Sequence, residues 1–151
     1  MKQQLYGIVL SALVTAQVAA AAETSPSWLC LAEQSTGFAF INGAWRATNF
    51  TPEKYILKVR KVTDIERCLE RNTELGKCPE FTGYVFTKFG EDDGDICKNN
   101  NSATIVCGSL FTYVVFYKAT LRFMSIYKAG YVDGDRPGNT PSITIGKCAP
   151  L

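Results

Sequence analysis

The pattern of apolar and polar positions predicts a chain made mainly of short β-strands. The pattern is sharpest from Gly37 to Phe50, where alternating apolar residues flank the dipeptide Asn42-Gly43. Asn-Gly is the preferred two-residue turn of a β-hairpin, because both central positions of a type I′ turn need a positive φ. With this turn Phe40 faces Trp45, an aromatic cross-strand pair that we expect to stabilise the hairpin by about 0.5 to 1 kcal/mol.

A half-buried strand and a helix are predicted after the hairpin. Lys54 to Val62 alternates between apolar and polar residues, which is typical of a strand with one face in the core. Thr63 to Glu66 then matches a capping box, and apolar residues follow at helical spacing until Gly76. We therefore predict one short helix, from about Asp64 to Glu74, that packs on the sheet.

The second half of the chain is rich in strand-forming residues. Segments of Val, Ile, Thr, Phe and Tyr are separated by Gly, Asn, Asp, Ser or Pro. Together with an early strand at Trp28 to Ala32 and the hairpin, they give about nine strands. Short strands with close turns predict a mainly β fold, a single-domain antiparallel β-barrel or sandwich with one short α-helix. The predicted strands of this half are Phe81 to Phe89, Ala103 to Cys107, Leu110 to Tyr117, Leu121 to Lys128 and Ile143 to Cys148.

Residues 1–22 have the pattern of a secretory signal peptide. Lys2 precedes an uncharged, largely apolar stretch, and residues 19–22 are all Ala, the small residue that signal peptidases accept at the cleavage site. An uncleaved membrane anchor is disfavoured, because the stretch is weakly hydrophobic and holds Ser, Thr and Gln. Cleavage would leave residues 23–151, enough for a single β-rich domain with its own core. We expect the mature protein to be periplasmic or secreted, with no membrane contact after cleavage.

All six cysteines lie in this mature part, and an even number in an exported chain predicts disulfides. Cys30 lies in the first predicted strand and Cys148 in the last, and the termini of compact domains are often close together. Cys97 and Cys107 flank the turn at Asn99 to Ser102. A zinc cluster is disfavoured because no C-x₂-C knuckle is present. Among the 15 possible pairings, we predict Cys30 with Cys148, Cys97 with Cys107 and, by what remains, Cys68 with Cys78.

The chain contains no histidine, which excludes several classes of chemistry. Ser/His and Cys/His nucleophiles, imidazole bases and His-containing zinc or copper sites are ruled out. Removing the leader takes away one lysine and no carboxylate, so the formal net charge falls from +2 to +1. This balance, without a block of like charges, gives no argument for nucleic acid as a partner. No catalytic, cofactor-binding or metal-binding residue is assigned by a motif, and no cofactor is expected.

Two acidic, glycine-containing loops are the remaining candidates for chemistry. Their carboxylates could bind calcium, although the spacing does not match a calcium-binding loop and Asp, Asn and Gly are ordinary turn formers. The same carboxylates could supply the acid and base of glycoside hydrolysis. The candidate residues are Asp92, Asp93 and Asp95 in the first loop and Asp133 and Asp135 in the second.

Several short segments resemble a family of small uncharacterised exported proteins of Gram-negative bacteria. These segments are Trp28-Leu29-Cys30, Ser35-Thr36-Gly37-Phe38, the residues Trp45 and Phe50, and the last strand, Ile143 to Cys148. Those proteins are similar in having a signal peptide, an early aromatic-x-Cys followed by Thr-Gly-Phe, and a late Cys. The resemblance covers about the first third of the chain and its last strand. It implies a periplasmic setting and brings no activity, ligand or catalytic residue.

These observations favour an exported, non-catalytic binding or interaction domain whose partner is a protein or a small molecule. An Asp/Glu-dependent hydrolase and a calcium-stabilised module are the alternatives. The aromatic residues of the strands are expected to fill the core for the most part. Whether they leave an open cavity decides between an interaction surface and a ligand carrier.

Overall fold

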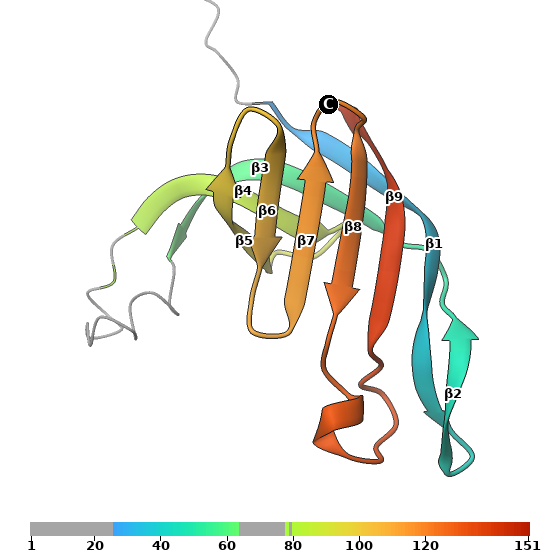
Figure 1. Ribbon diagram of the computed structural model, residues 1–151. Coiled ribbons are helices and arrows are strands. Elements are labelled where there is room, and N and C mark those ends of the chain that lie inside the picture. The colour runs from blue at the N-terminus through green and yellow to red at the C-terminus, as the bar shows by residue number, and fades with distance from the viewer. Residues whose placement is uncertain (1–25, 64–77, 79) are drawn as a thin grey trace, which may run out of the picture.

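Nine antiparallel strands make up most of the part of the chain that the computed structural model describes, residues 26–63, 78 and 80–151 (Figure 1). The strands are β1 (Trp28–Ile41), β2 (Ala44–Asn49), β3 (Lys54–Thr63), β4 (Glu80–Lys88), β5 (Gly94–Asn100), β6 (Thr104–Gly108), β7 (Thr112–Tyr117), β8 (Arg122–Tyr127) and β9 (Ser142–Pro150).

Eight of these strands close into a barrel. From β3 to β9 each strand pairs with the next along the chain, and β1 pairs with both β3 and β9. The backbone nitrogen of Leu151 also donates to the oxygen of Ser27 at 2.9 Å, so the two ends of the described chain are joined. The fold is therefore the barrel, and not the sandwich, of the two predicted architectures.

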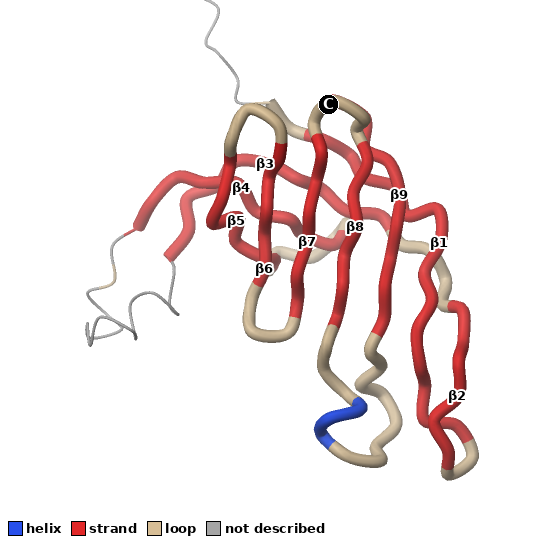
Figure 2. Tube along the Cα trace, in the orientation of Figure 1, coloured by secondary structure: helices blue, strands red, loops and turns tan. Residues whose placement is uncertain are grey.

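The ninth strand, β2, forms a hairpin with the second half of β1 and projects beyond the barrel (Figures 1 and 2). The turn is the predicted one, with φ of 52° at Asn42 and 79° at Gly43. Phe40 faces Trp45 with ring centroids 5.6 Å apart, as expected. The predicted early strand and the first arm of the hairpin form one continuous strand, β1. One edge of β1 pairs with β3 near the start of the strand and with β2 further along.

One strand was missed by the sequence predictions, and two predicted segments lie outside the described residues. Strand β5 was not predicted, because its sequence is polar and begins in the first acidic loop. The predicted helix from Asp64 to Glu74 lies outside the described residues, as does the predicted signal peptide. A 3₁₀ turn, Tyr131–Asp133, is the only helical element in residues 26–63 and 80–151, and no described helix is long and apolar enough to span a membrane.

The core occupies one half of the barrel interior. Leu57, Ile105, Val114 and Phe116 are fully buried there. Trp28, at the start of β1, covers this end, with its ring 5.7 Å from that of Tyr84 and 5.1 Å from that of Phe116. Alternate residues of the strands point inward, which is why these side chains meet.

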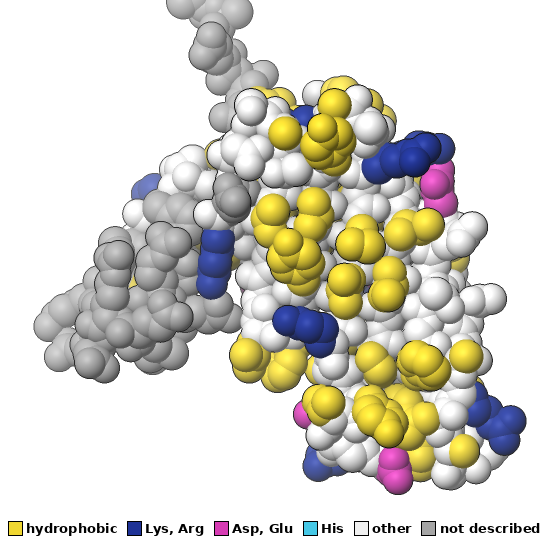
Figure 3. All heavy atoms as spheres, in the orientation of Figure 1, with side chains coloured by type: hydrophobic (Ala, Val, Ile, Leu, Met, Phe, Trp, Pro, Cys, Tyr) yellow, Lys and Arg dark blue, Asp and Glu magenta, His cyan; other side chains and the backbone are white. Residues whose placement is uncertain are grey.

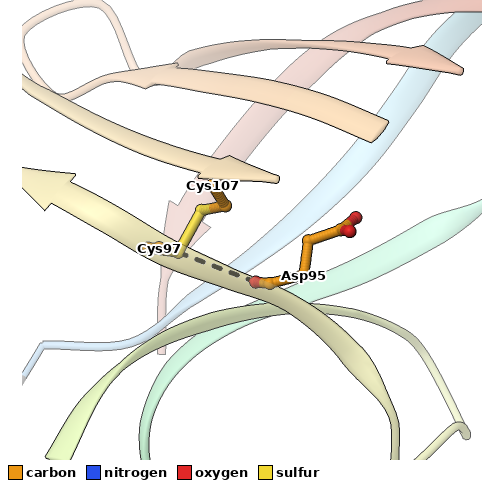
Figure 4. Close-up of a disulfide and its surroundings, with 3 residues drawn as sticks. All are labelled: Asp95, Cys97 and Cys107. Carbon is orange, nitrogen blue, oxygen red and sulfur yellow. Dashed lines mark hydrogen bonds between the residues drawn. A yellow bond between two sulfur atoms is a disulfide. The ribbon is translucent and has the colours of Figure 1, made fainter. Parts of the chain in front are cut away.

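Two disulfides connect neighbouring strands, and both are predicted pairs. Cys30 and Cys148 lie opposite each other on β1 and β9, and Cys97 and Cys107 lie opposite each other on β5 and β6 (Figure 4). All four cysteines are buried. Cys78 is not a free thiol, and its pairing with Cys68, which lies outside the described residues, stays a prediction.

Candidate functional site

The barrel is filled at the Trp28 end and hollow at the other. A cavity of about 440 Å³ opens at the hollow end, and a second cavity of about 300 Å³ adjoins it. Four residues line both cavities, Glu53 and Tyr55 from the start of the β3 region and Ser142 and Thr144 from β9. The two cavities therefore form one open site, which we call the barrel mouth.

Strand alternation places polar side chains in the mouth. On β8, buried Phe123 is followed at every second position by Ser125 and Tyr127, which line the larger cavity. Ser142 and Thr144 take the corresponding positions at the start of β9. The same inward face is thus apolar at the filled end of the barrel and polar at the open end.

Aromatic rings form the floor of the mouth. Tyr55 stacks on Phe86 with ring centroids 4.8 Å apart and an interplanar angle of 20°. Phe123 lies edge-on to Tyr55 at 5.8 Å and 5.6 Å from Phe86. Tyr55 and Phe86 both line the larger cavity, so a ligand there would rest on a flat, rigid surface that can take a sugar ring or another planar face.

Glu53 organises the charged wall of the mouth. Its Oε1 lies 2.5 Å from Lys88 Nζ, and its Oε2 accepts a hydrogen bond of 3.3 Å from the Tyr55 hydroxyl. The hydrogen bond to Glu53 raises the pKa of Lys88 above its ordinary value, so the lysine is cationic at neutral pH. Burial, together with the negative charge of Glu53, raises the pKa of Tyr55 to about 12, so this phenol is a neutral hydrogen-bond donor.

Hydroxyl groups form most of the remaining wall. The Ser35 and Thr144 hydroxyl oxygens are 2.9 Å apart and hydrogen-bonded across the junction of β1 and β9. Tyr127 donates its hydroxyl to Asn139 Oδ1 at 2.5 Å. Hydroxyls both donate and accept, so this wall can bind a ligand that carries hydroxyl or amine groups.

The structure divides the five predicted acidic residues between two places. Asp93 and Asp95 line the larger cavity, together with Glu91. The backbone oxygen of Asp92 accepts a hydrogen bond from Arg60. The Cys97 sulfur lies 3.9 Å from the backbone oxygen of Asp95, and Figure 4 shows the Asp95 carboxylate directed away from the disulfide.

The other two acidic residues hold a loop next to the hairpin. Asp133 Oδ2 accepts hydrogen bonds from the Gly130 backbone nitrogen and from Asn139 Nδ2, both at 3.1 Å. Asp135 Oδ1 accepts one from Trp45 Nε1 at 2.9 Å. These carboxylates stabilise the connection between β8 and β9 and are not part of the mouth.

Within the described ranges, no three Asp, Glu or Cys side chains are grouped so as to hold a metal ion. Sequence reasoning found Asp93 and Asp95 but missed Glu53, Tyr55, Lys88 and the serine and threonine residues of the mouth. Polar residues that alternate with apolar ones in a strand are normally assigned to the solvent side. Only the closure of the barrel shows that the serine and threonine residues of β8 and β9 face inward.

Comparisons with known proteins add no relative. No family model matches the chain, and no curated protein or solved structure matches it significantly. The function is therefore inferred from the geometry of the mouth.

Proposed function

We propose that this protein is an exported, non-catalytic binding domain that holds a small polar ligand in the barrel mouth. The observation that carries the proposal is the open cavity of about 440 Å³ on the stacked rings of Tyr55 and Phe86. Cavities of this size suit small molecules, and the mouth of a small barrel is a common place for them.

The wall of the mouth favours a neutral or cationic ligand rich in hydroxyl or amine groups. Besides Asp95, three carboxylates line the larger cavity, those of Glu53, Glu91 and Asp93, against the single lining cation of Lys88. An anionic ligand would be repelled by this excess of negative charge. A sugar or an amino sugar would place its flat face on the rings and its polar groups against the hydroxyls.

The disulfides of the described chain are consistent with an oxidising compartment. The signal-peptide pattern of residues 1–22 and the resemblance to exported proteins of Gram-negative bacteria support the periplasm or the cell exterior as the setting.

A ligand screen by thermal shift tests the proposal. Neutral sugars, amino sugars, amines and sugar phosphates are added to the mature protein at up to 10 mM, roughly the concentration at which weak millimolar binding becomes visible. We expect members of the first three groups, and not sugar phosphates, to raise the melting temperature. The shift should be lost in Ser125→Leu, which fills the mouth, and kept in the control Thr48→Val on β2, which lines neither cavity. The absence of any ligand-dependent shift would contradict the proposal.

A second candidate function is an Asp/Glu-dependent hydrolase, which the position of Asp93 and Asp95 in the same cavity favours. The test is an activity assay on a panel of glycans and peptides. Product release that is lost in Asp93→Asn or Asp95→Asn and kept in Asp133→Asn would favour the hydrolase over the non-catalytic binding domain.

The third hypothesis is a calcium-stabilised module. It predicts that EDTA lowers the melting temperature and that calcium restores it.

A further inference from the structure

The outer surface of β7, β8 and β9 is apolar where a solvent-facing sheet is usually polar. Two rows of cross-strand neighbours form it, Val115–Met124–Ile145 and Tyr113–Ile126–Ile143. Ile143 is 47% exposed, Ile145 43% and Met124 38%. Figure 3 shows several groups of hydrophobic side chains on the surface formed by these strands. We call these six residues the outer apolar face.

A groove extends this face toward the hairpin. Its volume is about 490 Å³, and it is bordered by Phe38 and Ala47 of the hairpin, by Pro141, and by Ile126 and Ile143 of the face itself. Phe38 is 54% exposed beside it. The groove is a recess large enough for one or two apolar side chains, whereas the face next to it is an open sheet surface.

The charges that flank the face are basic at both ends. Arg122 and Lys147 are cross-strand neighbours just beyond one row, and Lys128 follows β8 at the other end. Strands β7, β8 and β9 contain no carboxylate. Lys147 pairs with Glu33 at 2.9 Å, whereas no ion pair to Arg122 or Lys128 occurs within the described residues. The six-residue separation of these two along β8 corresponds to about 20 Å.

This charge pattern decides between the possible occupants. A second copy of the chain, docked face to face about a two-fold axis, would place its own basic residues against these basic residues, which is unfavourable. A flat bilayer would meet the convex sheet but would leave the recessed groove unfilled. A protein segment with apolar side chains and flanking carboxylates satisfies the face, the groove and both basic ends at once.

We propose that the outer apolar face and its groove bind an acidic protein partner, whose apolar side chains cover the face and whose carboxylates meet Arg122 and Lys128. The centre is apolar, with Tyr and Met, and the rim is charged, as in protein–protein interfaces. Exposed apolar patches with a polar rim commonly mark such sites. This surface lies on the outside of the barrel and does not depend on a ligand in the mouth.

Selection from a phage-displayed library of random 12-residue peptides on the immobilised mature protein tests the proposal. We expect enriched peptides with an apolar centre flanked by Asp or Glu. A synthetic enriched peptide should bind at least about tenfold more weakly to Met124→Glu and to the double variant Arg122→Glu with Lys128→Glu. Phe89→Glu, which changes a residue that is 59% exposed outside this face, is the matched control and should bind normally.

A charge-reversed peptide with Lys in place of its acidic residues should recover binding to the double variant, which separates complementarity from a loss of folding. Melting temperatures within a few degrees of the unmodified protein confirm that the variants fold. The proposal is overturned if the selected peptides lack carboxylates or if both variants bind them normally. It is equally overturned if Met124→Glu abolishes dimerisation in solution or binding to phosphatidylglycerol vesicles, because the face then serves a second copy or a lipid surface.

Discussion

Cys30 and Cys148 lie directly opposite each other on β1 and β9, with Cα atoms 3.8 Å apart, at the place where the barrel closes. The disulfide therefore joins the first strand of the barrel to the last, through two cysteines that are 118 residues apart in sequence. Because β1 and β9 hold each other through nine paired positions, the bond and the sheet constrain the same two segments.

The two described disulfides should differ in what they contribute to stability. In the chain-entropy model a loop of 118 residues gives about 4.9 kcal/mol and a loop of 10 residues gives about 2.7 kcal/mol. We expect Cys30→Ala with Cys148→Ala to lower the free energy of unfolding more than Cys97→Ala with Cys107→Ala. Urea denaturation of both double variants measures this difference. Equal losses would mean that loop length does not set the contribution.

The hairpin and the closing disulfide were predictable because each depends on a strong, specific signal. Asn42 and Gly43 both adopt a positive φ, and this local requirement is visible in the sequence itself. The pairing of Cys30 with Cys148 follows from the general closeness of chain ends. Strand β5 was missed because it is held by its neighbours, β4 and β6, and by a disulfide rather than by apolar residues.

The mouth could not be predicted, because alternation shows that a strand has two faces but not which face is inside. In β9 the apolar Ile143 and Ile145 would be assigned to the core, and Ser142 and Thr144 to solvent. The structure reverses both assignments, since Thr144 is 7% exposed and the two isoleucines lie outside. The candidate ligand site and the outer apolar face are two results of this one reversal.

Gly146 should tolerate no side chain. A Cβ at this position would lie 2.1 Å from the backbone oxygen of Leu31 and 2.6 Å from the Phe123 ring. We expect Gly146→Ala to destabilise the protein by about 1 to 3 kcal/mol, because the backbone of β1 cannot easily move away from β9. The reverse change on the outward side of the same strand, Ala149→Gly, should cost less than about 1 kcal/mol. Thermal unfolding of both variants checks this, and equal costs would contradict the steric explanation.

The stability of the protein should fall between about pH 10 and pH 12 because of Tyr55. Burial and the charge of Glu53 raise its pKa in the folded state to about 12, whereas a tyrosine in the unfolded chain titrates near 10. Above pH 10 the unfolded state loses the proton first, so the stabilising contribution present at lower pH is progressively lost.

Urea midpoints at pH 8, 10 and 11.5 measure this loss, with Tyr55→Phe as the matched variant. We expect the unmodified protein to lose more stability than Tyr55→Phe over this range. Glu53→Gln should lower the pKa of Tyr55 in a spectrophotometric titration of the phenol, because it removes the nearest negative charge. Identical pH profiles for the unmodified protein and Tyr55→Phe would refute the assignment.

Two buried threonines should respond in opposite ways to the same substitution. Thr87 is 3% exposed, and its hydroxyl has no hydrogen-bond partner among the described residues. Thr144 is 7% exposed and is hydrogen-bonded to Ser35 at 2.9 Å.

Replacing Thr87 by Val removes a buried, unpaired polar group and keeps the shape of the side chain. We therefore expect Thr87→Val to raise the free energy of unfolding by up to about 1 kcal/mol. Thr144→Val removes a hydrogen bond and leaves the Ser35 hydroxyl unpaired, so it should lower the free energy of unfolding by about 0.5 to 1.5 kcal/mol. Chemical denaturation of both variants gives the two signs directly, and a loss of stability in Thr87→Val as large as that in Thr144→Val would show that the Thr87 hydroxyl is satisfied in solution.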